Sequence, residues 1–137
     1  MQHGTQKVAK TAGKSRIIIV ETSSDVTAEN SNDVIVTGSH QGSGKHLLAC
    51  SVKGAIGNDA GKGKENAGIA GLKLLDEGGI PAAAVNNMTA RIGDGNSTYE
   101  QGKISAANEA AKKLGITEGM SARDAADKML EAASKRK

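Results

Sequence analysis

The stretch Gly54–Val85, GAIGNDAGKGKENAGIAGLKLLDEGGIPAAAV, decides the fold. It predicts a short strand at Ala55 and Ile56, a glycine-rich loop, an amphipathic helix, and a second strand that begins near Pro81. Two strands joined through a helix lie parallel in one sheet, with a right-handed crossover, so the stretch predicts one β-α-β unit. The helix is predicted from an apolar stripe at helical spacing, formed by Ile69, Ala70, Leu72, Leu74 and Leu75.

Further strands precede this unit. Arg16–Glu21 and Asp33–Thr37 are predicted to be buried strands, because β-branched residues run through both. The polar segment between them favours at most one short helical turn, near Thr27 to Glu29. Together with the central unit, these segments predict an α/β fold with layers built around a mainly parallel central sheet.

Three further helices are expected. Lys45–Val52 and Ile104–Leu114 have apolar residues at helical spacing. Residues 86–102, which precede the helix expected at Ile104–Leu114, are predicted to form a long loop. A final helix is predicted to start at Ser121. The chain therefore ends in two predicted helices, and the apolar stripe of the last one consists of Ala122, Ala125, Ala126, Met129, Leu130 and Ala133.

Composition indicates one domain with an aliphatic core. The 137 residues include 18 glycines and one tyrosine but no tryptophan or phenylalanine, and the formal net charge is +3. Positive charge is concentrated at the ends, in Lys7, Lys10, Lys14 and Arg16 and again in residues 135–137. With no aromatic side chains between these charges, nucleic-acid binding is not favoured. Residues 1–15 are predicted to be a flexible basic tail and residues 16–137 a single α/β domain.

The single cysteine, Cys50, excludes a disulfide framework and a cysteine-based metal site. Core packing is favoured for it over nucleophilic chemistry, because it lies on the apolar side of a predicted helix. No apolar run follows the N-terminal lysines and none is long enough to span a membrane, so the expectation is a cytoplasmic protein without a membrane partner.

Three loops follow predicted parallel strands, at residues 38–46, 57–66 and 86–102. Loops that follow parallel strands gather at one edge of the sheet, where open sheets bind ligands. This convergence predicts a site at the C-terminal edge. The polar residues that the three loops hold are Ser39, His40, Lys45, His46, Asn58, Asp59, Lys62, Lys64, Asn86, Asn87, Thr89, Arg91 and Asp94.

Catalytic roles are assigned to two of these residues. His40 is a candidate general base, although a solvent-facing loop histidine has the same sequence signature. Asp59 is the best single candidate acid, and an Asx turn is the structural alternative. A metal bound by His40 and His46 would need Asp59 or another carboxylate as a third ligand, so no metal site is predicted, and the sequence identifies no cofactor.

The remaining candidates are expected to bind an anion. Lys45 follows Gly44 at the start of a helix, but the Walker A spacing fails because the residue five before Gly44 is Ser39 and His46 follows the lysine. Simple anion binding by loop amides and Lys45 fits better. Arg91 either clamps a carboxylate or phosphate or pairs with Asp94 to brace its loop. The predicted ligand-binding residues are Ser39, Lys45, Asn58, Asn86, Thr89 and Arg91.

Residues 33 to about 104 resemble a swivelling β/β/α domain. The resemblance rests on Asp33–Thr37, Gly54–Gly61, AGI at residues 67–69, Gly79–Val85, ARIGDG at residues 90–95 and GKI at residues 102–104. Such domains occur in phosphoenolpyruvate-utilising phosphotransferases and in the small subunit of aconitase-X-type proteins. A plain Rossmann-like three-layer fold is the alternative architecture.

The resemblance has one departure that affects chemistry. In the phosphotransferases a histidine opens the helix and carries the phosphoryl group, whereas this chain has Asn66 there. An amide cannot carry that group, so phosphohistidine transfer is not implied. Similarity to the aconitase-X-type small subunit implies one part of a small-acid enzyme that works with a larger catalytic subunit.

Two functions are therefore expected from the sequence. The first is a small α/β enzyme or enzyme subunit that binds a small anionic metabolite, a carboxylate or a phosphate, in its glycine-rich loops. The alternative is a non-catalytic module that docks a partner or a second copy of itself through the alanine-rich C-terminal helices.

Overall fold

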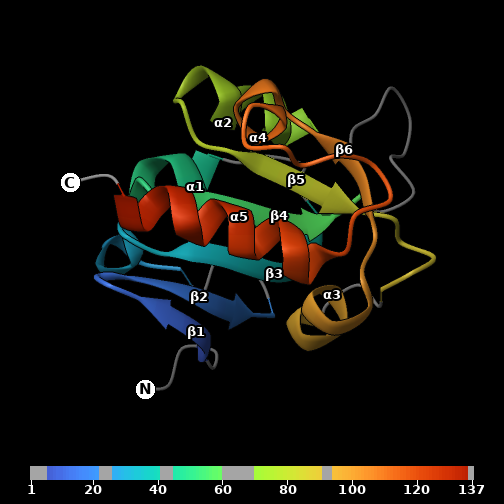
Figure 1. Ribbon diagram of the computed structural model, residues 1–137, viewed down its shortest axis with the longest axis horizontal. Helices are drawn as coiled ribbons and strands as arrows, with labels where there is room; N and C mark the ends of the chain where they lie inside the picture. Colours follow the sequence, from blue (N-terminus) through green and yellow to red (C-terminus); the bar gives the residue numbers. More distant parts are fainter. Residues whose placement is uncertain (1–5, 22–25, 41–44, 60–69, 91–93, 136–137) are drawn as a thin grey trace.

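The computed structural model describes residues 6–21, 26–40, 45–59, 70–90 and 94–135. Its main feature is one mixed sheet of six strands, in which the spatial order follows the sequence order (Figure 1). The four central strands are parallel to one another, and each edge strand is antiparallel to its neighbour. The strands are β1 (Lys7–Ala12), β2 (Ser15–Val20), β3 (Val34–His40), β4 (Gly54–Asn58), β5 (Ala82–Val85) and β6 (Ile104–Ala107).

Helices cover both faces of the sheet. The short helix η2 (Ala28–Asn30) and the helices α1 (Lys45–Cys50) and α2 (Ala70–Glu77) contribute to one face. On the other face lie α3 (Gly95–Gln101) and α5 (Ala122–Lys135), while α4 (Glu109–Lys112) lies beside β5 and β6 (Figure 1). The predicted α/β class with a mainly parallel central sheet is confirmed.

The two faces are built by strict alternation along the strands. In β2, Ile17 and Ile19 belong to the cluster under α5, while Ile18 and Val20 belong to the cluster under α1 and α2. All four are at most 4% exposed. A strand buried on both faces needs a continuous apolar run, which is why this segment was recognisable as a central strand.

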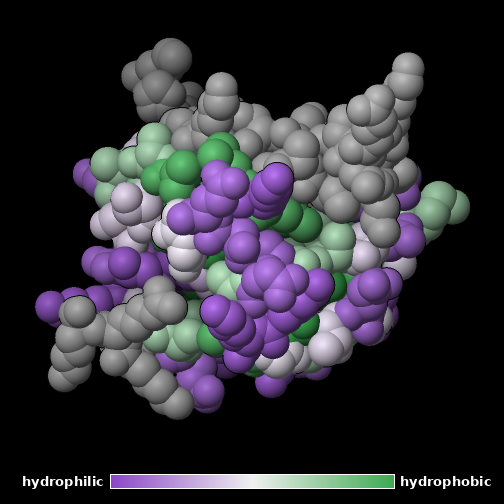
Figure 2. Space-filling view, turned by 90° about the horizontal axis from the view of Figure 1, so that it is seen from above, coloured by the Kyte–Doolittle hydropathy of each residue, from purple (hydrophilic) through white to green (hydrophobic). Residues whose placement is uncertain are grey.

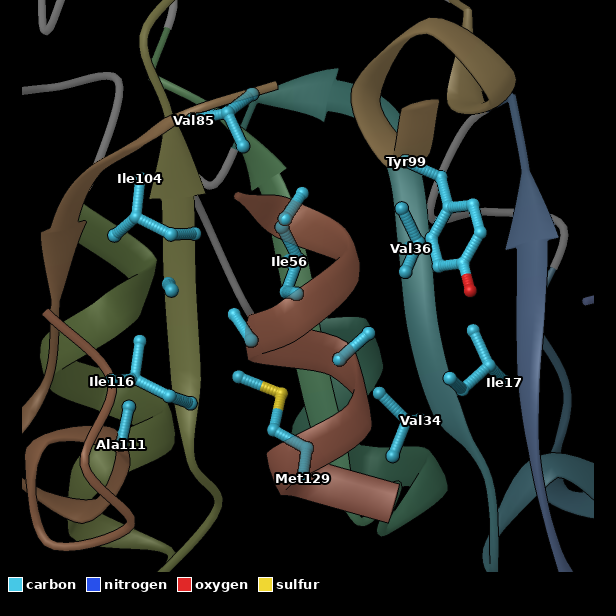
Figure 3. Close-up of a cluster of buried hydrophobic side chains, with 14 of the residues drawn as sticks. Ile17, Val34, Val36, Ile56, Val85, Tyr99, Ile104, Ala111, Ile116 and Met129 are labelled. Carbon is cyan, nitrogen blue, oxygen red and sulfur yellow. The ribbon is translucent and has the colours of Figure 1, made fainter. Parts of the chain in front are cut away.

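The last helix lies close against the sheet. Its stripe, predicted from the sequence, is buried from Ala122 to Ala133, and Met129 projects between Ile56 and Val34 (Figure 3). Gly54 makes this approach possible, since a Cβ at that position would lie 2.8 Å from the Met129 Sδ atom. The alanine stripe of α5 is thus part of the internal core.

Exposed surfaces are mostly polar in the described part of the chain. Seen from above, hydrophilic side chains occupy the middle of the view (Figure 2). Lys73 and Glu77 on α2 and Lys113 after α4 are exposed. The large hydrophobic side chains that are exposed among the described residues are Val8 and Met88. No described helix has the length and apolar character that crossing a membrane requires.

Residues 7–12 differ from the flexible tail expected from the sequence. They form edge strand β1, joined to β2 by a two-residue turn in which Gly13 has a φ of 60°. Glycine adopts this conformation readily, and a positive φ at the first turn position suits the twist of a hairpin. β1 is mostly exposed and buries only small side chains such as Ala9 and Ala12 against the core, so its hydrophobic signal was too weak to find.

The prediction for residues 86–114 was wrong in two places. The predicted loop 86–102 contains α3, and the predicted helix 104–114 consists of β6 followed by α4. Small side chains such as Ala106 and Ala107 fit either structure. The missed signals were two helix caps: the side chain of Asp94 accepts from the Ser97 N–H at 3.0 Å, and that of Asn108 accepts from the Ala111 N–H at 2.9 Å.

Asn108 joins four segments around the N-terminal end of β5. Its Oδ1 also accepts from the Ala82 N–H at 3.0 Å, and its Nδ2 donates to the carbonyls of Leu72 at 3.1 Å and Ile80 at 2.9 Å. The residue is 7% exposed. All hydrogen-bonding capacity of this buried amide is therefore used, and it fixes α2, the start of β5, the end of β6 and α4 relative to one another.

We expect Asn108→Ala to lower the free energy of unfolding by about 3 kcal/mol, because it leaves buried backbone groups without partners. Asn108→Asp should be at least as damaging near neutral pH, since a carboxylate would face two carbonyl oxygens. Urea denaturation measures both effects. The matched control is Asn96→Ala, an exposed site on α3, for which a change within about 0.5 kcal/mol is expected. Equal effects at the two sites would contradict this role of Asn108.

Candidate functional site

The C-terminal ends of three parallel strands lie side by side. In the strand pairing, His40 at the end of β3 is opposite Asn58 at the end of β4, and Asn58 is opposite Val85 at the end of β5. The loops that follow these strands therefore start from one edge, at the right of Figure 1. The predicted convergence holds for the described beginnings of all three loops.

Asn58 and Asp59 form a buried polar pair where β4 ends. Asn58 is fully buried and its Nδ2 donates to the Ala90 carbonyl at 3.2 Å. Asp59 is 2% exposed. Its Oδ1 accepts from the Asn87 N–H at 3.0 Å, and its Oδ2 accepts from the Ser105 hydroxyl at 2.6 Å. Hydrogen bonds to an ionised carboxylate are among the stronger ones in proteins, so Asp59 ties the loop after β5 and the strand β6 to the end of β4.

The loop after β5 begins with a tightly bonded turn. Asn86 accepts from the Met88 N–H through its side chain at 2.7 Å, which is an Asx turn. The Thr89 hydroxyl donates to the Asn86 carbonyl at 2.6 Å and accepts from the Lys103 N–H at 3.0 Å. The turn is therefore fixed on both sides and holds Met88, which is 86% exposed, in solvent.

The chain is next described at the start of α3, on the far side of the parallel strands. Gly95 packs on the end of β2, where a Cβ would lie 2.2 Å from the Val20 carbonyl oxygen. Asn86 therefore lies at the end of β5 and Gly95 at the end of β2, the two outer strands of the parallel set. Asp94 caps α3 at this point, which is a use for its side chain that the sequence analysis did not consider.

The strand order bears on how a pocket could form here. From β2 to β5 the parallel strands follow the sequence without a reversal. Open α/β sheets bind ligands where that order reverses, because the neighbouring connections then diverge to opposite faces. In this part of the chain the connections through η2, α1 and α2 all lie on one face. Diverging helices therefore do not form a pocket at this edge in the described part of the chain.

Several predicted site residues lie wholly or partly outside the described residues. Ser39 and His40 are described as backbone of β3, and Lys45 as the first residue of α1, without their side chains. Arg91, Lys62 and Lys64 are outside the described ranges. The structure thus brings together Asn58, Asp59, Asn86, Asn87 and Thr89, and the catalytic roles of His40 and Asp59 remain predictions.

Ser105 is a site residue that the sequence analysis missed. It lies on β6, which was predicted as part of a helix, and it forms the 2.6 Å bond to Asp59. Nothing in its local sequence marks it, because the contact joins residues 46 positions apart. Only the antiparallel pairing of β6 with β5 brings it to this edge.

Cys50 has the environment of a packing residue. The side chain is 8% exposed, and its Sγ contacts the Val26 carbonyl oxygen at 3.8 Å. Burial raises the pKa of the Cys50 thiol, which favours the uncharged form over a reactive thiolate. Among the described residues, no three histidine, cysteine, aspartate or glutamate side chains are grouped so that they could hold a metal ion.

Comparison of the chain with family models, with curated proteins and with solved structures gives no match.

We expect Asp59 and Ser105 to be energetically coupled. In a double-mutant cycle of Asp59→Ala and Ser105→Ala, the coupling energy should be about 1–2 kcal/mol, because the 2.6 Å bond is charge-assisted and shielded from water. Urea denaturation of the four proteins measures it. Additive effects, with coupling below about 0.3 kcal/mol, would show that this contact contributes little.

Proposed function

We propose that this chain binds a small anionic metabolite, a carboxylate or a phosphate, at the C-terminal edge of its parallel strands. The observation that carries the proposal is the convergence of three strand ends at one edge. β3, β4 and β5 end side by side, and hydrogen bonds to Asn58 and Asp59 hold the beginning of the loop that follows β5. Binding residues are commonly placed on loops that a rigid scaffold supports.

The buried polar residues supply that scaffold. Asn58 and Asp59 use their side chains to hold the backbone of the loop at Ala90 and Asn87. In this proposal they position the loop, and ligand contacts come from Ser39, Lys45, Thr89 and Arg91. This division gives Asp59 a positioning role and makes His40, whose ordinary pKa lies near neutrality, the candidate for proton transfer.

The positive charge of two predicted ligand-binding residues is consistent with an anionic ligand. Lys45 and Arg91 follow the ends of β3 and β5, respectively, and a guanidinium binds carboxylate or phosphate oxygens in a bidentate manner. The resemblance of residues 33 to about 104 to swivelling domains favours a small acid as the class of ligand. It also favours a larger catalytic subunit as a partner.

Ligand binding would raise the melting temperature. With inorganic phosphate, succinate or citrate at ten times its Kd, the folded state gains about 1.4 kcal/mol, which is a rise in Tm of about 4 °C for a domain of this size. Arg91→Gln and Lys45→Gln should each reduce this rise by at least half. The matched control is Lys113→Gln, an exposed position after α4, which should leave the rise unchanged.

The location of binding is tested by NMR. Amide signals of Asn58, Asp59, Asn87 and Thr89 should shift in a saturable manner during the same titrations. If none of the three anions moves these signals, or if Arg91→Gln and Lys45→Gln behave like Lys113→Gln, the proposed function is wrong.

A further inference from the structure

A second hollow lies at the opposite, N-terminal edge of the sheet. It is bounded by the turn between β1 and β2, by the residues that precede β3 and β4, and by the last turn of α5. In Figure 1 this is the left end of the molecule, where the C-terminus lies. Its volume is about 470 Å³, which is within the usual size range of small-molecule sites.

Two lysines give this hollow its charge. Lys14 comes from the β1–β2 turn and Lys53 from the residue before β4. Neither ammonium group forms an ion pair in the described part of the chain. None of the described side chains that line the hollow is acidic. Two cationic residues and no acidic residue among the described lining make the hollow electropositive.

The acidic residue beside the hollow is already neutralised. Asp33 follows the lining residue Asn32 and is 1% exposed. Its two oxygens accept from Arg16 at 2.8 and 3.2 Å, and Oδ2 also accepts from the Asn30 amide at 3.0 Å. This pairing raises the pKa of Arg16. The Asp33 charge is thus held by another cation, so it does not cancel the two lysines.

Neutral polar groups complete the lining. Ser15, Asn32 and Ser134 supply hydroxyl and amide groups, and the Ser134 hydroxyl donates to the Glu131 carbonyl at 3.0 Å. The end of α5 carries the partial negative charge of a helix C-terminus. Stabilisation of that helix end is therefore an alternative role for the two lysines. The experiment below separates this role from ligand binding.

We propose that this hollow is a second ligand site, for a small oxyanion with at least two negative charges, such as a phosphate ester or a dicarboxylate. Lys14 and Lys53 bind the oxyanion, and the hydroxyl and amide groups bind the polar remainder of the ligand. The site lies at the opposite end of the strands from the proposed function, and neither depends on the other.

NMR titration tests the proposal on the full chain at constant ionic strength. Pyrophosphate and succinate serve as probes and distinguish phosphate from carboxylate ligands. At least one of them should shift the amide signals of Gly13, Asn32 and Ser134 in a saturable manner. The double variant Lys14→Gln/Lys53→Gln should weaken this binding at least tenfold, whereas Lys14→Arg/Lys53→Arg should retain it and Lys113→Gln should leave it unchanged.

Three outcomes would overturn the proposal. One is the absence of saturable shifts at this edge with either probe. Another is unchanged binding in the glutamine double variant. The third is a lowered Tm of the glutamine double variant when the unsubstituted protein itself binds neither anion. That result would mean that the lysines stabilise the end of α5. Signals at Asn58 and Asn87 report the other edge in the same spectra, so the two sites succeed or fail separately.

Discussion

The close approach of α5 to the sheet at Gly54 is the constraint on which the rest of the structure depends. Without tryptophan or phenylalanine, the core is built from isoleucine, valine, leucine, alanine and methionine around one tyrosine. Such side chains fill space only if the backbones come near one another. The absence of a side chain at Gly54 admits Met129, and β5 presents three buried alanines from Ala82 to Ala84 to its two faces.

Buried polar side chains fix the relative positions of segments that a thin aliphatic core does not fix alone. Asn108 fixes the segments around the start of β5, Asp59 fixes the C-terminal edge, and Asp33 with Arg16 fixes the N-terminal edge. Each joins segments distant in sequence through several hydrogen bonds. A buried polar group is favourable only when its partners are all present, so these residues also penalise alternative packings of the same elements.

The two ends of the parallel strands have different characters. At the C-terminal end, buried polar groups hold the beginning of the loop that follows β5. At the N-terminal end, short turns leave a hollow lined by two lysines, which have no acidic partners in the described part of the chain. The connections through η2, α1 and α2 all use one face of the sheet, so neither end is opened by helices that diverge.

Much of the central fold could be predicted because its signals are local. Each signal lies within one short segment of the sequence. The segments are the β-branched runs of β2 and β3, the β-α-β unit from Gly54 to Val85, and the stripe of α5. The edge elements could not be predicted in this way. β1 buries too little to show a pattern, and the small residues of β6 fit a helix as well as a strand.

The candidate site likewise has a part that could be predicted from the sequence and a part that could not. The sequence by itself determined which strands are parallel, and therefore that Asn58, Asp59 and Asn86 start from one edge. Only the tertiary structure decided that Ser105 joins them and that both Asp59 oxygens accept hydrogen bonds within the protein. It alone brought the turn at Lys14 beside Lys53. The physical reason is that hydrophobic periodicity acts over neighbouring residues, whereas the partners of a buried carboxylate and the lining of a hollow are set by how distant segments pack.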